Sequence, residues 1–345
     1  MELKDISRYR TKLMGMAICM IMICHNTVEV PDGVCNIIKS IISNFCQGGV
    51  DLFFLLSGLG CVFSYSNSIN FQQFYKKRFL RILPTYILII IVYGIFCICI
   101  VQNIDVYDYV KKYNLISFWQ TGNLSEWFIA AICALYIMFP ILYILLKSSK
   151  FFLSIIWFIV ALSIMFSASS YNEVLEVINE IFICRIPAFL VGMLIGKKIK
   201  EGEEGDEKKI PPFFYLIFIS IIWIINYFMK VKNWMVISRL LFLPWWIFLF
   251  PYICKIFNDK KSKLLLLGTI TLEIYLIHEK LLGITFYIFS KINCGNFIAS
   301  VCSNITAILG AIVLGKIIHC IILKVFEICH KIKKLRLIQT KNVKR

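Results

Sequence analysis

The chain has 345 residues, of which 59 % are hydrophobic and 17 % are charged, and its formal net charge is +17. Soluble domains are about 45–50 % apolar and about 25 % charged, so this composition excludes an assembly of ordinary soluble domains. The apolar residues form long blocks, which excludes a transmembrane β-barrel because barrel strands are short and alternate in polarity. We therefore predict an all-α membrane protein.

A helix needs about 20 mostly apolar residues to cross the hydrocarbon of a membrane. Ten segments of the chain are apolar and approach this length. These segments are 13–28, 49–66, 80–101, 125–146, 151–168, 181–196, 212–229, 237–254, 264–289 and 298–323. The apolar segment 34–46 is too short to span, and we interpret it as a half-helix lying in the membrane interface. The sequence therefore predicts a bundle of about ten transmembrane helices.

Lysine and arginine are concentrated in alternate loops of this bundle. With both termini inside, the inner segments hold 27 of the 37 basic residues and the outer loops hold six. This asymmetry predicts cytoplasmic termini and a multi-pass protein of the plasma (inner) membrane. Because the positive charge is explained by topology, membrane lipid and not nucleic acid is the expected partner.

The chain reads as one membrane domain over 1–345. Its cytoplasmic linker lies near 197–211, where Glu201–Lys209 is the only stretch resembling a soluble linker, and a basic cytoplasmic tail covers 324–345.

Most of the 14 cysteines lie inside apolar runs and none form a CxxC pair, so we expect packing residues and no metal site. Cys35 and Cys46 share a predicted outer loop, where a disulfide is weakly indicated.

Two histidines lie within predicted spans, where polar side chains are expensive and usually functional. His25, with Asn26 beside it, lies about 20 Å of helix beyond Lys12, and His278 lies about 20 Å beyond Leu264. Both are thus expected in the outer half of the membrane at a similar depth. Imidazole exchanges protons near neutral pH, which suits acid–base chemistry, although each residue taken alone is equally consistent with a core or interfacial histidine.

Other charged residues also fall in apolar segments. Arg185 stands beside Pro187, Glu273 and Glu279 flank His278, and Glu126 opens a predicted span. These side chains are predicted to face a polar cavity or a partner. The alternative for Arg185 is that it extends to the interface, and Trp127 could equally belong to an aromatic belt.

Two further motifs are candidates. The glycine-rich run Gly48–Gly58 contains Asp51 at its outer entrance and Ser57 deeper, a pattern that helix packing would also explain. A later segment reads FQQFYKKRFLRILP and places four cations at a cytoplasmic helix start: Lys76, Lys77, Arg78 and Arg81. Such a patch can bind phosphates, or can serve only as a positive-inside anchor.

Taken together, the sequence resembles the acyltransferase-3 family of bacterial membrane acyltransferases. Four blocks carry the resemblance in the family's order: the basic first span ending at His25; GGVDLFFLLSG with FYKKRFLRILP; EWFIAAICALYIMFP; and RIPAFLVGMLIG with LEIYLIHE. The resemblance implies O-acylation, usually O-acetylation, with cytoplasmic acetyl-CoA or another acyl-CoA as co-substrate. The expected acceptor is a hydroxyl of a cell-envelope glycan or a lipid-linked saccharide, so the process would be a polysaccharide modification. The chain resembles members that lack an extracytoplasmic esterase domain.

One position departs from the family pattern. The family often has arginine eleven positions before the first-span histidine, and this chain has Met14 there, with Arg10 and Lys12 nearby. In this chain, Arg10 or Lys12 would supply that charge from one turn lower.

We predict that Lys76, Lys77, Arg78 and Arg81 hold the donor's phosphates. His25 is predicted to act as general base or to carry the acyl group briefly. Arg185 would neutralise the developing oxyanion, and His278 with Glu279 or Glu273 would orient the acceptor or relay a proton.

The main alternative function is a transporter or flippase of an envelope precursor that uses its intramembrane His and Arg. Another alternative is a non-catalytic sensor of the same fold. The sequence indicates no oligomeric state, acceptor identity or acyl length.

Overall fold

The computed structural model describes residues 3–26, 28, 34–65, 70–102, 104–168, 172–202, 239, 243–256, 262–292 and 295–342. Helices make up most of this part of the chain, and no strand occurs in it, which confirms the predicted all-α class. The helices in chain order are α1 (Lys4–Arg8), α2 (Arg10–Cys24), α3 (Val34–Cys46), α4 (Gly48–Tyr65), α5 (Phe71–Ile95), η1 (Phe96–Val101), α6 (Val106–Tyr113), α7 (Ser117–Thr121), α8 (Trp127–Leu145), α9 (Ser149–Ala168), α10 (Glu173–Ile181), η2 (Ile183–Arg185), α11 (Ile186–Glu201), η4 (Trp245–Leu249), α14 (Phe250–Ile256), α15 (Lys263–Thr269), α16 (Thr271–Lys291) and α17 (Asn296–Asn342).

Within the described residues, six helical segments are long and apolar enough to cross a membrane. They are Cys35–Tyr65, Phe71–Val101, Trp127–Leu145, Ser149–Phe166, Glu173–Glu201 and Asn296–Ile328. The predicted span 212–229 lies outside the described part, and 237–254 lies partly outside it. The segment 34–46 is α3, which is followed by α4 after Gln47 and so belongs to one long apolar segment.

Close helix packing explains several glycines of the chain. A Cβ at Gly58 of α4 would overlap the carbonyl oxygen of Phe189, and a Cβ at Gly192 of α11 would overlap that of Leu55. Because each helix presents a glycine where the other presents backbone, α4 and α11 approach closely along their length. The predicted role of the GGVDLFFLLSG run in packing is therefore present in the structure.

The predicted span 264–289 is not one continuous helix. It divides at Ile270, whose φ and ψ of −111° and 21° end α15 before α16 begins at Thr271. α15 packs on α2, with Gly15 and Gly268 at the contact. Since α15 and α16 are separate helices, a straight count from Leu264 does not give the depth of His278.

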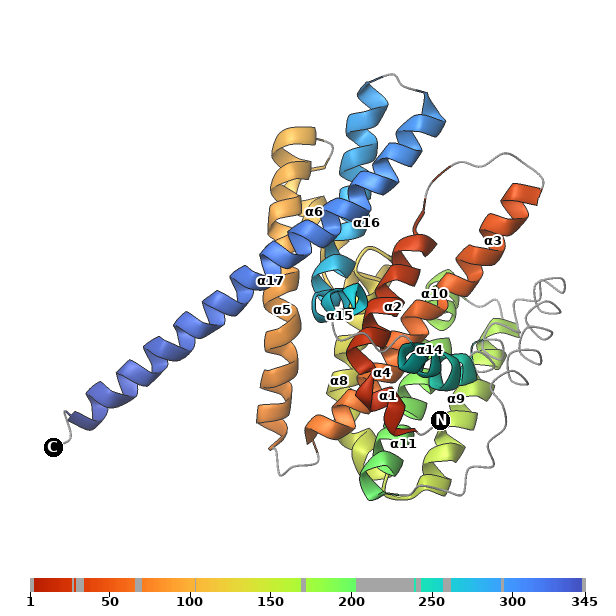
Figure 1. The fold of residues 1–345 in the computed structure, drawn as a ribbon, viewed down its shortest axis with the longest axis vertical. Coiled ribbons are helices and arrows are strands. Elements are labelled where there is room, and N and C mark those ends of the chain that lie inside the picture. Colours follow the sequence, from red (N-terminus) through yellow and green to blue (C-terminus); the bar gives the residue numbers. More distant parts are fainter. Residues whose placement is uncertain are drawn as a thin grey trace.

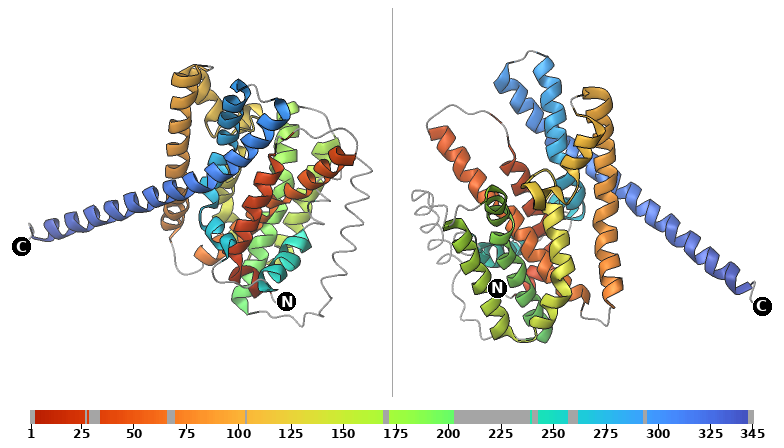
Figure 2. Two further views of the ribbon diagram at one scale, coloured as in Figure 1. Left: turned by 45° about the horizontal axis from the view of Figure 1, so that its top comes forward. Right: turned by 180° about the vertical axis from the view of Figure 1, so that it is seen from behind.

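Figure 1 shows how these helices are arranged. α2, α4, α8 and α11 lie in the body of the bundle, while α5 stands along one edge and α17 crosses α5 and α16 obliquely. The far end of α17 extends well away from the other helices in all views (Figure 2). A helix of 47 residues is about 70 Å long, more than twice the hydrocarbon thickness of about 30 Å. α17 therefore extends beyond what a single crossing needs.

Candidate active site

The structure brings the two histidines of the predicted spans into contact. His25 caps the C-terminal end of α2 and His278 lies in the second turn of α16. Nε2 of His278 is 2.9 Å from Nδ1 of His25, and the ring centroids are 5.0 Å apart. His278 is buried with 4 % of its surface exposed, and His25 is half-buried. The two imidazoles form a hydrogen-bonded pair between helices that are distant in sequence.

The surroundings of His278 decide where the protons of this pair lie. Nδ1 of His278 contacts the carbonyl oxygens of Ile274 at 3.1 Å and Tyr275 at 2.8 Å. Carbonyl oxygens only accept, so Nδ1 of His278 carries the proton, and in the neutral ring Nε2 is an acceptor. Nδ1 of His25 must then donate to it, and the free lone pair of His25 lies on Nε2. That nitrogen is the basic atom of the pair.

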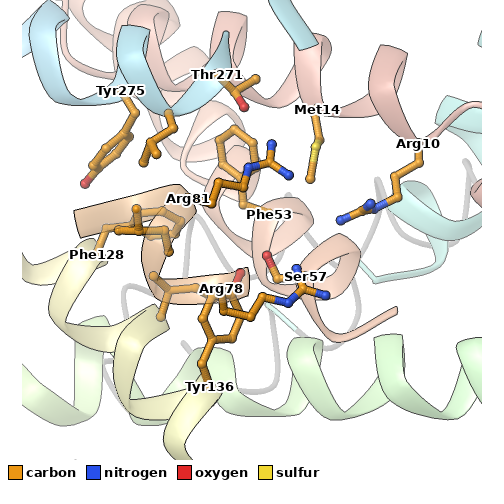
Figure 3. A pocket seen from close by; sticks show the side chains of 13 residues that line it. Arg10, Met14, Phe53, Ser57, Arg78, Arg81, Phe128, Tyr136, Thr271 and Tyr275 are labelled. Atoms are coloured by element: carbon orange, nitrogen blue, oxygen red, sulfur yellow. The ribbon is translucent and has the colours of Figure 1, made fainter. Parts of the chain in front are cut away.

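A cavity of about 70 Å³ lies deeper in the bundle, between α2, α4, α5, α8 and α16. Three arginines line it, Arg10, Arg78 and Arg81, and Figure 3 shows their guanidinium groups directed toward the same space. Its other lining residues are Met14, Phe53, Ser57, Ile82, Phe128, Ile132, Tyr136, Thr271, Leu272 and Tyr275. No carboxylate is among these residues, so the cavity is strongly cationic.

Arg78 is held rigidly at this cavity. It donates to the carbonyl oxygen of Gly60 at 2.6 Å and to Oγ of Ser64 at 2.7 Å, and its guanidinium lies 5.3 Å from the ring centre of Tyr136. Its Nε is buried without a hydrogen-bond partner in the described part of the chain. A buried, unsatisfied donor beside two other arginines is the environment that an anionic phosphate oxygen would complete.

Arg10 lies one helical turn before Met14, and both line the cavity. Nε of Arg10 donates to the carbonyl oxygen of Leu56 at 3.2 Å, and a Cβ at Gly60 would overlap the guanidinium. Gly60 thus leaves the space that Arg10 occupies. The structure places the cation one turn below the family's usual arginine position, where the sequence had indicated Arg10 or Lys12.

Aromatic side chains connect this cavity with the histidine pair. The rings of Phe128 and Tyr275 both line the cavity and are 4.8 Å apart. The ring of Tyr275 is in turn 5.8 Å from that of His278. Tyr275 therefore lies between the arginine-lined cavity and the two imidazoles.

Asp51 is the centre of a second group of charges. It is 2 % exposed, in the first turn of α4, and its Oδ1 lies 3.3 Å from Nε of Arg185. Nη1 of Arg239 is 3.1 Å from Oδ2. Arg185 also donates from Nη1 to the carbonyl oxygens of Glu180 and Ile181, and its guanidinium carbon is 5.2 Å from the ring centre of Trp127. Arg185 is thus buried and held by an acid, as its position in an apolar segment predicted.

Glu126 forms an ion pair with a lysine that the sequence analysis did not select. Its Oε1 accepts from Nζ of Lys280 at 2.6 Å, and both groups are buried. The ammonium group also lies 5.9 Å from the ring centres of Tyr93 and Tyr113. This ion pair joins the start of α8 to α16. Because Lys280 follows His278 by two residues, the pair holds the part of α16 that carries His278.

Among the described residues, the acidic side chains near His278 form no hydrogen bond or ion pair with it. Oε1 of Glu273 is 2.8 Å from Nδ1 of His319 on α17, and the side chain of Glu279 is exposed. Asn26 is exposed and accepts from the backbone N–H of Val28. None of these three side chains has a contact with the histidine pair in the described part of the structure, and their predicted roles stay predictions.

The four cations of the FQQFYKKRFLRILP segment do not share one site. Arg78 and Arg81 line the arginine cavity, whereas Lys76 lines an apolar groove on the other face of α5, beside Phe79 and Pro84. Lys77 is exposed and lines neither. Residues three apart share a helix face, which explains why only the two arginines converge.

Sequence reasoning did not select Arg239, Lys280, His319 or Tyr136. The first three were visible as ionisable residues inside or beside apolar segments, the same signal that selected Arg185. Tyr136 carried no signal because an aromatic residue in a spanning helix is ordinary.

Among the described residues, no group of three His, Cys, Asp or Glu is placed to hold a metal ion. Cys35 and Cys46 are both free thiols.

Comparison with known proteins places these features in a family. The family model described as an acyltransferase domain, acyltransferase-3, matches residues 13–316, which includes both histidines and the cavity arginines Arg78 and Arg81. No curated protein and no solved structure is similar enough to count as a match.

Proposed function

Since the chain belongs to the acyltransferase-3 family, we propose that it is a membrane-embedded O-acyltransferase. It would move an acyl group, most simply acetyl, from cytoplasmic acyl-CoA to a hydroxyl of a cell-envelope glycan or lipid-linked saccharide. The observation that supports this best is the hydrogen-bonded pair of His25 and His278, next to Tyr275, which also lines the cavity of the three arginines.

The arginine cavity suits the phosphate groups of the donor. Arg10, Arg78 and Arg81 supply several charge-assisted donors with no acid among the lining residues to neutralise them. Ser57, Thr271 and Tyr136 add hydroxyl groups beside them. Because Arg10 and His25 lie at opposite ends of α2, about 22 Å apart along the helix, a long and thin thioester arm is required to reach from one to the other.

In the proposed reaction, Nε2 of His25 takes the proton of the acceptor hydroxyl as the hydroxyl oxygen attacks the thioester carbonyl carbon. The new C–O bond forms, the C–S bond breaks, and the departing sulfur takes the proton from His25. His278 holds Nδ1 of His25 throughout, which keeps Nε2 as the reacting nitrogen and disperses the positive charge of the transient imidazolium. Arg185 would stabilise the carbonyl oxygen while that oxygen becomes an oxyanion.

A second route is chemically available at the same atom. Nε2 of His25 could attack the thioester itself and carry the acyl group until the acceptor arrives. The two routes are separated by quenching a reaction that contains donor alone. Label bound to wild-type protein and absent from His25→Ala supports the acyl-histidine, whereas label that appears only in acceptor product supports direct transfer.

The proposed activity is tested with membranes and radiolabelled acetyl-CoA. Membranes containing the protein should incorporate label into glycan or lipid-linked saccharide, and membranes containing His25→Ala should not. Movement of unlabelled saccharide across the membrane without incorporation would support the transporter alternative and contradict the proposal.

A further inference from the structure

Among the described residues, a buried positive charge near the histidine pair has no compensating acid. Arg185 and Arg239 both contact Asp51, so the three side chains carry a net charge of +1. Asp51 is the only carboxylate that pairs with either arginine within the described residues. The segment that carries Arg239 offers no alternative, because residues 208–258 contain neither Asp nor Glu. Nε of Arg239 is also buried without a hydrogen-bond partner among the described groups.

Three helix starts meet at this cluster and increase its positive potential. Asp51 lies in the first turn of α4, Arg185 directly precedes α11, and Trp127 is the first residue of α8. The N-terminal end of a helix carries a partial positive charge from its unpaired N–H groups. One carboxylate therefore faces two guanidinium groups and three positive helix ends in an apolar bundle, where surplus charge is expensive.

The cluster is separate from the donor cavity and lies near the histidine pair. Both arginines are within electrostatic range of Cys24, the residue before His25, and Arg185 is within range of Tyr275, which contacts His278. Neither Arg185 nor Arg239 lines the cavity of Arg10, Arg78 and Arg81. The described part of the chain thus has two separate cationic sites.

We propose that the Asp51, Arg185 and Arg239 cluster binds the acceptor through a negatively charged group, a phosphate or a carboxylate. The inference rests on the proposed acyl transfer and names the chemical class of its second substrate. The donor's phosphates already have a cationic site in the arginine cavity, so the second site serves the other substrate. An acceptor anion would satisfy Nε of Arg239 and neutralise the surplus charge, and it would bring an acceptor hydroxyl beside Nε2 of His25.

The charge of the product tests this directly, whatever the identity of the acceptor. Membranes of the native cells are incubated with radiolabelled acetyl-CoA, and the His25-dependent labelled product is applied to an anion exchanger at neutral pH. We expect the exchanger to retain the label. Partition of the labelled product into organic solvent identifies a lipid-linked phosphate, and its recovery in water followed by loss of retention after carboxyl reduction identifies an acidic glycan. A neutral product contradicts the inference while leaving the acyltransferase proposal intact, and absence of any His25-dependent label overturns the acyltransferase proposal itself.

Variants of Arg239 link the product's charge to the cluster. Purified protein with Arg239→Gln, titrated with the acceptor extract, should need about tenfold more acceptor for half-saturation at an unchanged KM for acetyl-CoA, and Arg239→Lys should recover part of the loss. Arg8→Gln removes an exposed arginine on α1 and serves as the matched control, with unchanged half-saturation. If Arg239→Gln and wild type unfold at the same temperature and need the same acceptor concentration for half-saturation, Arg239 does not bind the acceptor and the proposal is overturned.

Discussion

Nδ1 of His25 donates to Nε2 of His278 across 2.9 Å, and this one hydrogen bond joins residues 253 positions apart in the chain. The backbone carbonyl oxygens of Ile274 and Tyr275 fix the orientation of His278 from behind. His278 is therefore a positioning residue in this account, and His25 is the residue that meets substrate.

Replacing His278 separates these two roles. We expect His278→Ala to lower kcat by about 10²-fold, because His25 would lose the acceptor that keeps its proton on Nδ1. The KM for acetyl-CoA should not change, since His278 does not line the arginine cavity. Steady-state kinetics on purified protein measures both constants. A rise in KM with kcat unchanged would show that His278 helps to bind donor instead.

The arginine cavity predicts which cations matter for the donor. Arg78→Gln should raise the KM for acetyl-CoA by about tenfold or more, because a hydrogen bond to a charged group contributes about 1.5–3 kcal/mol. Lys77→Gln, one position earlier and exposed, is the matched control and should leave KM unchanged. Equal effects of the two substitutions would mean that this segment acts only through its general charge.

Arg10 provides a second test of the same cavity. Arg10→Gln should raise the KM for acetyl-CoA by about tenfold, the effect of losing about 1.4 kcal/mol of binding free energy. The double variant Arg10→Gln with Met14→Arg should recover much of the loss, because both positions line the cavity one turn apart. Failure of Arg10→Gln to alter KM would remove Arg10 from the donor site.

The buried pair of Glu126 and Lys280 should be important for stability. Removing one partner leaves a buried charge unpaired, so we expect Lys280→Met to lower the free energy of unfolding by about 3–5 kcal/mol. The double change Glu126→Leu with Lys280→Met should be milder than either single change. Thermal unfolding in detergent measures the three variants, and additive losses would contradict direct coupling of the two groups.

Glycine packing predicts opposite effects at two helical glycines. Gly192→Ala should lower the unfolding temperature, because the new methyl group would overlap the carbonyl oxygen of Leu55. Gly283→Ala on α16 meets only the hydroxyl of Tyr93 at 3.8 Å, so it should be neutral or slightly stabilising. A harmless Gly192→Ala would show that α4 and α11 are not in such close contact.

The helical class and the buried charges could be predicted from sequence because both follow from the cost of polar groups in hydrocarbon. That rule selected Arg185, Asp51 and Glu126, all of which are buried in ion pairs. It gave no partners, since Asp51 and Arg239 are 188 positions apart and only the fold brings them together.

Helix breaks were harder to predict than helices. The apolar run 264–289 has no proline at its interruption, and the helix that ends at the break, α15, packs on α2. The sequence placed His25 and His278 at a similar depth, but by a straight count that the break at Ile270 interrupts. It could not show that Glu273 has another partner. Glu273 faces α17 and His319, a contact that only the crossing of α17 over α16 creates.

The most direct test of the account is acyl transfer by His25→Ala at saturating acetyl-CoA. The account predicts a loss of about 10³-fold or more in transfer of label, with thermal unfolding and the KM for acetyl-CoA unchanged. Undiminished transfer by a folded His25→Ala protein would contradict it.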